Sequence, residues 1–435
     1  MENNRIYPKI EKAYSIIGQY CFEQMTKLYG NNPPELITDR LDKEMNFVEN
    51  SDFAVTILTA RHIAKKYMQN DCLVDARGTA GSSFINFLLG ISRINPLPAH
   101  QHCLKCKTIT FMPEADSGFD LSGKPCVKCG KEMEIDGHNI PFESFFGMNG
   151  EKRPSVDIEV SNTMFECSFE ILGELFSDAI IAKHGFVDSY TKKLKTRPNC
   201  HYIIPEKYKD AEGLEYTKTA AGIPVIVSNN GFELQERLFA QYILPQNSLF
   251  RLEVLANHTG VSNYLVPMND IDIYTAFSSC NTQTIPMFYT DFSLKILIAC
   301  KPKCFSDLIK IAGLLNCNGG WLDNADLILK DNIASLSEII SNREDVYNIL
   351  IENGQSRETA YEIMTNVSRG KSELLSKEEF DAYNLPDWYY DSCEKINYLS
   401  PKAHIVNHVK IAVQLMWYKL NFPAEYNKVT ESFLN

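Results

Sequence analysis

The strongest constraint on this chain is a pair of cysteine knuckles, Cys103-Leu-Lys-Cys106 and Cys126-Val-Lys-Cys129, with nineteen residues between them. A C-x2-C turn lets two thiolates reach one ion, and two such turns supply the four ligands of a tetrahedral zinc site. Because four protein ligands leave no coordination position open, the pattern predicts structural rather than catalytic zinc. The surrounding lobe, about residues 100–150, has little apolar sequence, so we expect the metal to hold it folded.

Length and composition limit the class of protein. The 435 residues are 44% hydrophobic and 11% aromatic, which is typical of a globular chain with two to four domains. Apolar runs such as Leu294–Cys300 are shorter than the about 20 residues of a membrane helix, and the first residues lack the pattern of a signal peptide. We therefore expect a cytoplasmic protein with no membrane partner. The formal net charge of −12 disfavours a simple basic coat for nucleic acid.

A loop of small residues follows the short apolar run at 72–74 and precedes an apolar stretch that ends at Ile91. This order predicts a strand, a turn and the start of a helix. Glycines let a backbone approach an anion closely, and a helix N-terminus attracts negative charge, so the loop has the composition of a phosphate site. A purely structural turn is the alternative, because small residues before helices are common. The candidate phosphate-binding residues are Arg77, Gly78, Gly81, Ser82 and Ser83.

Carboxylates form the second candidate group. Residues 155–160 alternate polar or small with apolar, which predicts a strand with Ser155, Asp157 and Glu159 on one face. A second predicted strand, Leu249–Leu255, carries Glu253 between apolar neighbours. Two or three carboxylates that converge from neighbouring strands can hold two magnesium ions on a triphosphate. The alternative is an outer strand face in water.

Helical periodicity covers most of the rest of the chain. Apolar residues recur near a 3.6-residue period up to Gly30, from Phe53 to Tyr67 and from Met164 to Lys183, and nearly all of Phe305–Phe422 reads as helix. With the predicted strands, this pattern gives an α+β fold class.

In this order the motifs resemble the polymerase core of the PolC-type DNA polymerase III alpha subunit. The resemblance also rests on the motifs Asn95-Pro-Leu-Pro98, Asp136–Glu143, Gly150-Glu-Lys152, Pro154–Asp157, Trp321–Ala325, Arg369-Gly-Lys371 and Pro401-Lys-Ala-His404. It implies a polymerase beta-like nucleotidyltransferase palm with a zinc lobe, an inserted helical thumb and mostly helical fingers. On this basis we expect N-terminal helices and palm in 1–163, a shortened thumb in 164–240, a palm strand in 241–260 and truncated fingers in 261–435.

The resemblance assigns roles to individual residues. Asp157 and Glu253 fall on the second and third catalytic aspartates of the family and are the implied magnesium ligands, and Glu159 on the same strand face as Asp157 is a substitute ligand. Residues implied near the nucleotide are Arg369, Lys371, Lys402 and His404. The implied reaction transfers a nucleotide from a nucleoside triphosphate to a DNA 3′ hydroxyl with Mg²⁺. DNA, nucleoside triphosphate and a replisome protein are the expected partners, and no clamp-binding module is evident.

One departure from the family pattern leaves two hypotheses open. Ser155 stands where the family has its first catalytic aspartate, and a neutral serine is a poor magnesium ligand. The chain is then either a divergent polymerase that uses Asp157, Glu159 and Glu253, or a catalytically impaired pseudo-polymerase. The second would bind DNA, nucleotide or replisome partners without chemistry.

Overall fold

The computed structural model describes residues 5–49, 53–150, 155–228 and 231–434. Parts of two motifs of the family resemblance, Glu151-Lys152 and Pro154, lie outside the described residues. Within those ranges, no helix has both the length and the apolar character needed to cross a membrane.

Three helices form the N-terminal part: α1 (Ala13–Tyr29), α2 (Glu35–Glu49) and α3 (Phe53–Met68). Their buried residues recur every three or four positions, as Ile17, Cys21 and Met25 do in α1, so each helix turns one apolar stripe inward. The two helices predicted in this region, ending at Gly30 and at Tyr67, are confirmed. Next come β1 (Val74–Ala76), a 3-10 turn (Gly78–Ser82) and α4 (Phe84–Leu88), the strand, loop and helix that the sequence predicts.

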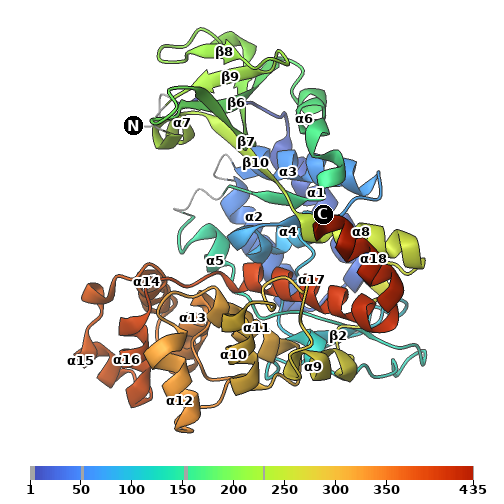
Figure 1. Cartoon of the computed structure of the whole chain (residues 1–435), viewed down its shortest axis with the longest axis vertical. Coiled ribbons are helices and arrows are strands. Elements are labelled where there is room, and N and C mark those ends of the chain that lie inside the picture. Colours follow the sequence, from blue (N-terminus) through green and yellow to red (C-terminus); the bar gives the residue numbers. More distant parts are fainter. Residues whose placement is uncertain (1–4, 50–52, 151–154, 229–230, 435) are drawn as a thin grey trace.

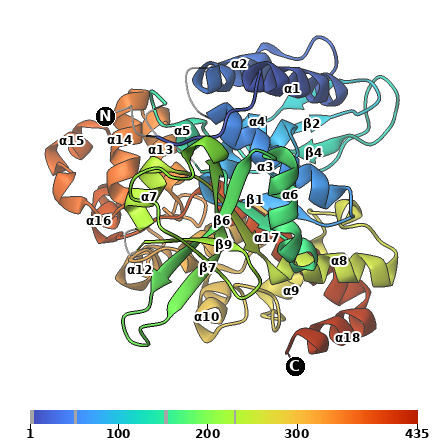
Figure 2. The same cartoon turned by 90° about the horizontal axis from the view of Figure 1, so that it is seen from above.

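A seven-stranded sheet has the order β1-β5-β10-β7-β6-β9-β8. Strand β5 (Ile158–Val160) lies antiparallel to β1 and parallel to β10 (Phe239–Pro245), and Ile158 and Val160 are fully buried, as predicted. The other strands are β6 (Ala179–Val187), β7 (Leu194–Pro205), β8 (Tyr216–Lys218) and β9 (Pro224–Val227). In Figure 1 these four strands lie toward the top of the molecule beside α6 (Ser168–Leu175), and Figure 2 views them from above.

The prediction of a helical thumb is therefore wrong for most of 164–240. Among the described residues of this range, only two 3-10 turns (Asn162–Cys167 and Glu206–Tyr208), α6 and the short α7 (Gly231–Arg237) are helical, whereas residues 179–187 form the long hairpin strand β6. The apolar run Ala179–Ala182 fits either period, and a short apolar run does not distinguish helix from strand. Pairing with β7 over nine positions decides the outcome.

The predicted strand at Leu249–Leu255 is also wrong. These residues lie in helix α8 (Asn247–Thr259), which begins after Gln246, whose side chain accepts a hydrogen bond from the Ser248 N–H. Leu249, Leu252 and Leu255 recur every third residue and are fully buried, which is a helical stripe rather than strand alternation. The strand in this part of the chain is β10, which ends two residues before α8 begins.

The second half of the chain is helical, as predicted from Phe305 onward. Helix α17 (Lys402–Asn421) passes through its middle and packs against α8, α9, α11 and the turn after β1 (Figure 1). The remaining helices are α9 (Ile271–Ser278), α10 (Asp291–Cys300), α11 (Phe305–Leu315), α12 (Asp326–Lys330), α13 (Arg343–Glu352), α14 (Arg357–Ser368), α15 (Lys377–Ala382), α16 (Asp387–Lys395) and α18 (Pro423–Leu434).

Buried polar contacts join the two halves of the molecule. The Glu143 carboxylate on α5 (Glu143–Phe146) accepts hydrogen bonds from Arg357 on α14 and from the Tyr347 hydroxyl on α13. The Ser144 hydroxyl donates to Glu344 at 2.6 Å. The other Glu344 oxygen accepts the Lys402 N–H at 2.6 Å, so this carboxylate also positions the start of α17.

The fully buried side chain of Glu44, on α2, holds the end of the small-residue loop in place. Its carboxylate accepts hydrogen bonds from the Arg40 guanidinium, the Ser83 hydroxyl and the N–H groups of Phe84 and Ile85, all at 2.7–3.0 Å. Negative charge at the first turn of α4 satisfies N–H groups that have no partner within the helix.

Replacing Glu44 with alanine leaves Arg40 and two amides without their buried partner. We expect Glu44→Ala to lower the free energy of unfolding by about 3 kcal/mol or more, measured by urea denaturation. Glu49→Ala, at an exposed position of the same helix, should change it by less than about 0.5 kcal/mol. Equal effects of the two substitutions would contradict this role of Glu44.

Candidate functional site

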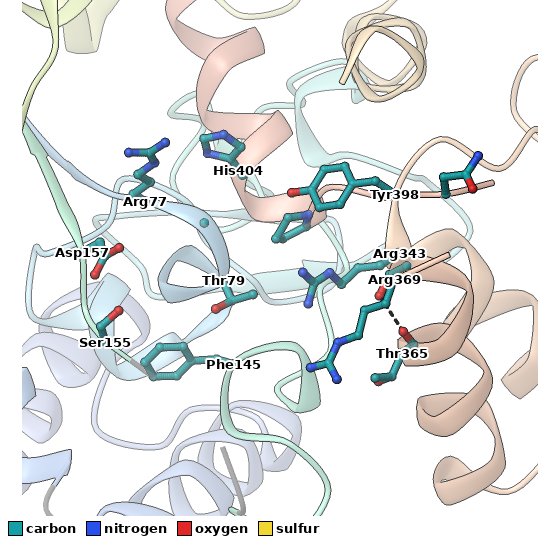
Figure 3. Close-up of a pocket in the computed structure, with 14 residues that line it drawn as sticks. Arg77, Thr79, Phe145, Ser155, Asp157, Arg343, Thr365, Arg369, Tyr398 and His404 are labelled. Carbon is teal, nitrogen blue, oxygen red and sulfur yellow. Dashed lines mark hydrogen bonds between the residues drawn. The ribbon is translucent and has the colours of Figure 1, made fainter. Parts of the chain in front are cut away.

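A pocket of about 750 Å³ opens between the start of the small-residue loop, strand β5 and the helices α13, α14 and α17 (Figure 3). It brings together segments from the whole length of the chain. Its lining residues are Arg77, Gly78, Thr79, Phe145, Ser155, Asp157, Arg343, Thr365, Ser368, Arg369, Asn397, Tyr398, Pro401 and His404.

Three guanidinium groups give the pocket its positive charge. Arg77 follows β1, Arg343 is the first residue of α13, and Arg369 directly follows α14, so the three come from separate parts of the fold. Figure 3 shows Arg343 and Arg369 on the side opposite Asp157 and Ser155, with Arg77 nearer to His404. Gly78 beside them has φ +63°, which favours glycine, and a Cβ there would meet no atom within 4 Å. The backbone is therefore open to a ligand at this point.

The second half of the predicted phosphate loop does not line the pocket. Gly81, Ser82 and Ser83 are buried, and a Cβ on Gly81 would lie 3.1 Å from the Cβ of Ala403 in α17. The amides at the start of α4 already donate to Glu44. Of the five predicted loop residues, the structure thus brings Arg77 and Gly78 to the pocket and leaves the other three behind it.

Asp157 is the carboxylate of the pocket. It precedes β5, and its backbone oxygen accepts the Arg77 N–H at 2.9 Å, which fixes the loop beside it. Burial raises the pKa of Asp157, while a hydrogen bond from Ser155 and the charge of Arg77 lower it. The predicted face of Ser155 and Asp157 is therefore at the pocket.

Glu159, two residues further on, lies deeper than the pocket. It is 4% exposed, and its Oε1 lies 3.7 Å from Arg77 Nε. Burial, and next the charge of Asp75, raise the pKa of Glu159 to about 7. The Asp75 carboxylate itself forms a buried ion pair with Arg93 at 2.9 Å.

Glu253 lies on helix α8 and not on a strand beside Asp157. One carboxylate oxygen accepts the Leu73 N–H, and the other accepts the hydroxyls of Ser161 at 2.6 Å and Thr163 at 3.3 Å. Burial raises the pKa of Glu253, and these hydrogen bonds lower it. The contacts tie α8 to both strands at one end of the β1–β5 pair, a structural role that accounts for the burial of Glu253. Glu253 is not among the lining residues of the pocket.

Strand β10, the parallel neighbour of β5, carries no carboxylate near Asp157. Ile243 of β10 aligns with Ile158 of β5, so Tyr242 comes directly before the aligned pair. Asp157 is close enough that its charge contributes to raising the pKa of Tyr242, after burial and Cys200. The amide of Gln241 donates to the Val156 carbonyl at 2.8 Å. Sequence reasoning missed this position because it took the following helix for the strand.

Of the four nucleotide-site residues predicted in the helical half, two line the pocket and two do not. Arg369 and His404 line the pocket, and burial, then His408 and Arg77, lower the pKa of His404 to about 3. Lys371 is exposed and does not line the pocket. Lys402 is buried, and its Nζ lies 3.4 Å from the Asp116 carbonyl. Arg343 and Tyr398 were not predicted, because nothing in their local sequence sets them apart.

The four knuckle cysteines form a second site. They belong to a lobe around a three-stranded sheet of β2 (His100–His102), β3 (Ile109–Phe111) and β4 (Glu134–Asp136). Their sulfur atoms all lie within 4.8 Å of one another, so the predicted cluster can hold a metal ion. Gly130, with φ +69°, closes the second knuckle by donating its N–H to the Cys126 carbonyl at 2.7 Å. Cys103, Cys126 and Met133 are the only buried apolar residues that the described part of the lobe gathers around the sulfur atoms.

Comparison with known proteins places these features in one family. Residues 15–225 match the family model of the bacterial DNA polymerase III alpha NTPase domain, and residues 251–384 match that of the alpha subunit finger domain. Together the two matches cover about four fifths of the chain. The sequence thus has the domain pair of a bacterial DNA polymerase III alpha subunit.

Similar proteins of known type identify the kind of DNA polymerase III that the chain resembles. The DNA polymerase III PolC-type of Thermotoga maritima is 30% identical over 474 residues, covering 96% of this chain and 35% of the relative. Those of Clostridium perfringens and Ureaplasma parvum are each 30% identical over 96% of this chain and 33% of the relative. The chain belongs to the PolC-type DNA polymerase III family. It spans about a third of the length of the curated relatives it matches.

The contacts of Glu253 predict a loss of stability when its carboxylate is removed. Glu253→Ala leaves a buried amide and a buried hydroxyl without acceptors, so we expect the free energy of unfolding to fall by about 2 kcal/mol or more in urea denaturation. Glu362→Ala, at an exposed position in α14, is the control and should change it by less than about 0.5 kcal/mol. Unchanged stability of Glu253→Ala would mean that the carboxylate is not a structural acceptor.

Proposed function

We propose that this chain is a pseudo-polymerase that binds a nucleoside triphosphate in the pocket and transfers it to a DNA 3′ hydroxyl poorly or not at all. The observation that carries the proposal is that Asp157 is the only carboxylate among the described residues that line the pocket. Binding and chemistry make different demands on a site, and this pocket meets the first better than the second.

The demand of binding is positive charge in a shaped cavity. Arg77, Arg343 and Arg369 converge on the pocket from three elements, and guanidinium groups form strong, often bidentate hydrogen bonds with phosphate oxygens. The open backbone at Gly78 allows close approach by a phosphate. Tyr398 supplies an aromatic surface at the same wall. These features support a triphosphate as the ligand.

The demand of two-metal chemistry is a set of carboxylates that converge on one point. Serine occupies position 155, Glu253 is engaged with Leu73 and Ser161, and the neighbouring strand offers Tyr242. The residues present therefore do not fit two magnesium ions held by Asp157 and Glu253, and we derive no reaction step through them.

The second candidate function is a divergent nucleotidyltransferase that uses Asp157 and Glu159. It is favoured by one observation, the position of both residues on one strand beside Arg77. Glu159 would have to leave its buried place to share a metal with Asp157. DNA is a further ligand that family membership supports for both functions, and a replisome protein is a possible partner of either.

Nucleotide binding can be measured separately from chemistry. We expect the chain to bind a non-hydrolysable nucleoside triphosphate in isothermal titration calorimetry, and Arg343→Ala and Arg369→Ala each to weaken binding about tenfold or more, the value of one charge-assisted hydrogen bond. Lys330→Ala, at an exposed position on α12, is the matched control and should leave the affinity unchanged. Absence of binding by the unmodified chain would overturn the proposed ligand.

Incorporation assays with labelled nucleotides, primer–template DNA and Mg²⁺ or Mn²⁺ separate the two candidate functions. The pseudo-polymerase should give no incorporation above a background that Asp157→Ala shares. Incorporation that is lost in Asp157→Ala would establish the transferase instead.

We further propose that the cysteine cluster holds one structural zinc ion. Four cysteine sulfur atoms within 4.8 Å support this role, as do the few buried apolar residues around them, Cys103, Cys126 and Met133 in the described part of the lobe. Cys106→Ser should lower the zinc content by about one ion per chain in elemental analysis and increase proteolysis within about residues 100–150. Cys167→Ser, outside the cluster, should retain the metal. Equal zinc content in the two variants would contradict the assignment.

A further inference from the structure

A third group of potential ligands lies behind the pocket wall. His404 and His408 are four residues apart on α17, so they share one face of the helix, and their ring centroids are 4.4 Å apart. That face meets β5, where Glu159 points toward it. One ligand atom from each of Glu159, His404 and His408 lies within 4.8 Å of the other two.

The chemistry of this group suits a transition metal rather than magnesium. Two imidazole nitrogens and one carboxylate oxygen form a ligand set typical of zinc and related divalent ions, whereas magnesium prefers oxygen ligands. Ligand atoms about 2.0–2.1 Å from a tetrahedral ion are about 3.4 Å apart. The ligand atoms here lie within 4.8 Å of one another, so they have to approach by at most about 1.4 Å.

Neighbouring side chains contact Glu159, but within the described residues they leave a ring nitrogen of His404 without a hydrogen bond. The Asn407 amide lies 3.5 Å from one Glu159 oxygen, and a hydrogen bond from Gln246 also reaches this carboxylate. The Nδ1 atom of His404 is buried and has no hydrogen-bond partner within the described part of the chain. A buried ring nitrogen without a partner is unfavourable, and coordination of an ion by the cluster would supply one.

Arg77 is the competitor for this site. Its Nε lies 3.7 Å from the other Glu159 oxygen, so its positive charge opposes a cation there. The Arg77 side chain is 44% exposed and has room to turn away into the pocket. Removing this side chain should therefore strengthen metal binding, although it removes a contact for phosphate.

We propose that Glu159, His404 and His408 bind one divalent transition-metal ion, of which Zn²⁺ is the best match. Three protein ligands leave a coordination position open. His404 also lines the pocket, so the proposed metal site adjoins the cavity. The site uses neither the cysteine cluster nor Asp157, and it does not depend on nucleotide binding.

Zinc content tests the proposal on the full chain. After equilibrium dialysis at micromolar Zn²⁺, His408→Asn and Glu159→Gln should each contain about one zinc ion fewer than the unmodified chain in elemental analysis. His258→Asn, at an exposed position in α8, is the matched control and should lose none. The difference between variants is the readout, so it is independent of whether the cysteine cluster binds zinc.

Two further measurements separate the loss of a metal ligand from misfolding and from metal binding at a cysteine. Circular dichroism checks that the variants fold, and Co²⁺ added to the chain with zinc only in the cysteine cluster should give visible bands without the thiolate charge transfer that a cysteine ligand would give. Arg77→Ala should bind the second ion severalfold more tightly. The proposal is overturned if folded His408→Asn and Glu159→Gln keep the full zinc content, or if the unmodified chain binds no ion that these substitutions remove.

Discussion

The close packing of Ala403 on Gly81 is the contact on which the arrangement of the site depends. Helix α17 begins at Lys402 and lies directly on the turn after β1 because position 81 has no Cβ. This approach brings His404 to the pocket next to Arg77 and His408 toward Glu159. A larger residue at 81 would push the helix from the strand pair, and both the pocket and the histidine group would open together.

Sequence reasoning succeeded where the signal is local. The cysteine knuckles, the strand–loop–helix at 72–91 and the alternation at 155–160 are local patterns. The structure contains the first two, and the third forms a strand over Ile158–Val160 only. Sequence reasoning failed at Leu249–Leu255, where five alternating residues outweighed a stripe of leucines with helical spacing. Because of this error, Glu253 was predicted to lie in the site, and Tyr242, on the strand that pairs with β5, was not predicted there.

Other features of the site were beyond sequence reasoning for a different reason. Arg343 reaches the pocket only because α13 packs beside α14 and both are held to α5 through Glu143 and Glu344. Glu159, His404 and His408 come together through the contact of α17 with β5, from segments far apart in the chain. Tertiary packing creates such neighbours, and no periodicity in the sequence records them.

The carboxylate of Glu44 has a consequence for ligand binding. The Glu44 carboxylate accepts the N–H groups at the start of α4. These are the groups that would otherwise be free to bind a phosphate. The loop in front of Glu44 is therefore already ordered before any ligand arrives, and a nucleotide would not have to supply the free energy to order it. The same arrangement limits the number of phosphate contacts that the backbone can offer, so the arginine side chains, rather than the helix end, must determine how tightly the ligand is held.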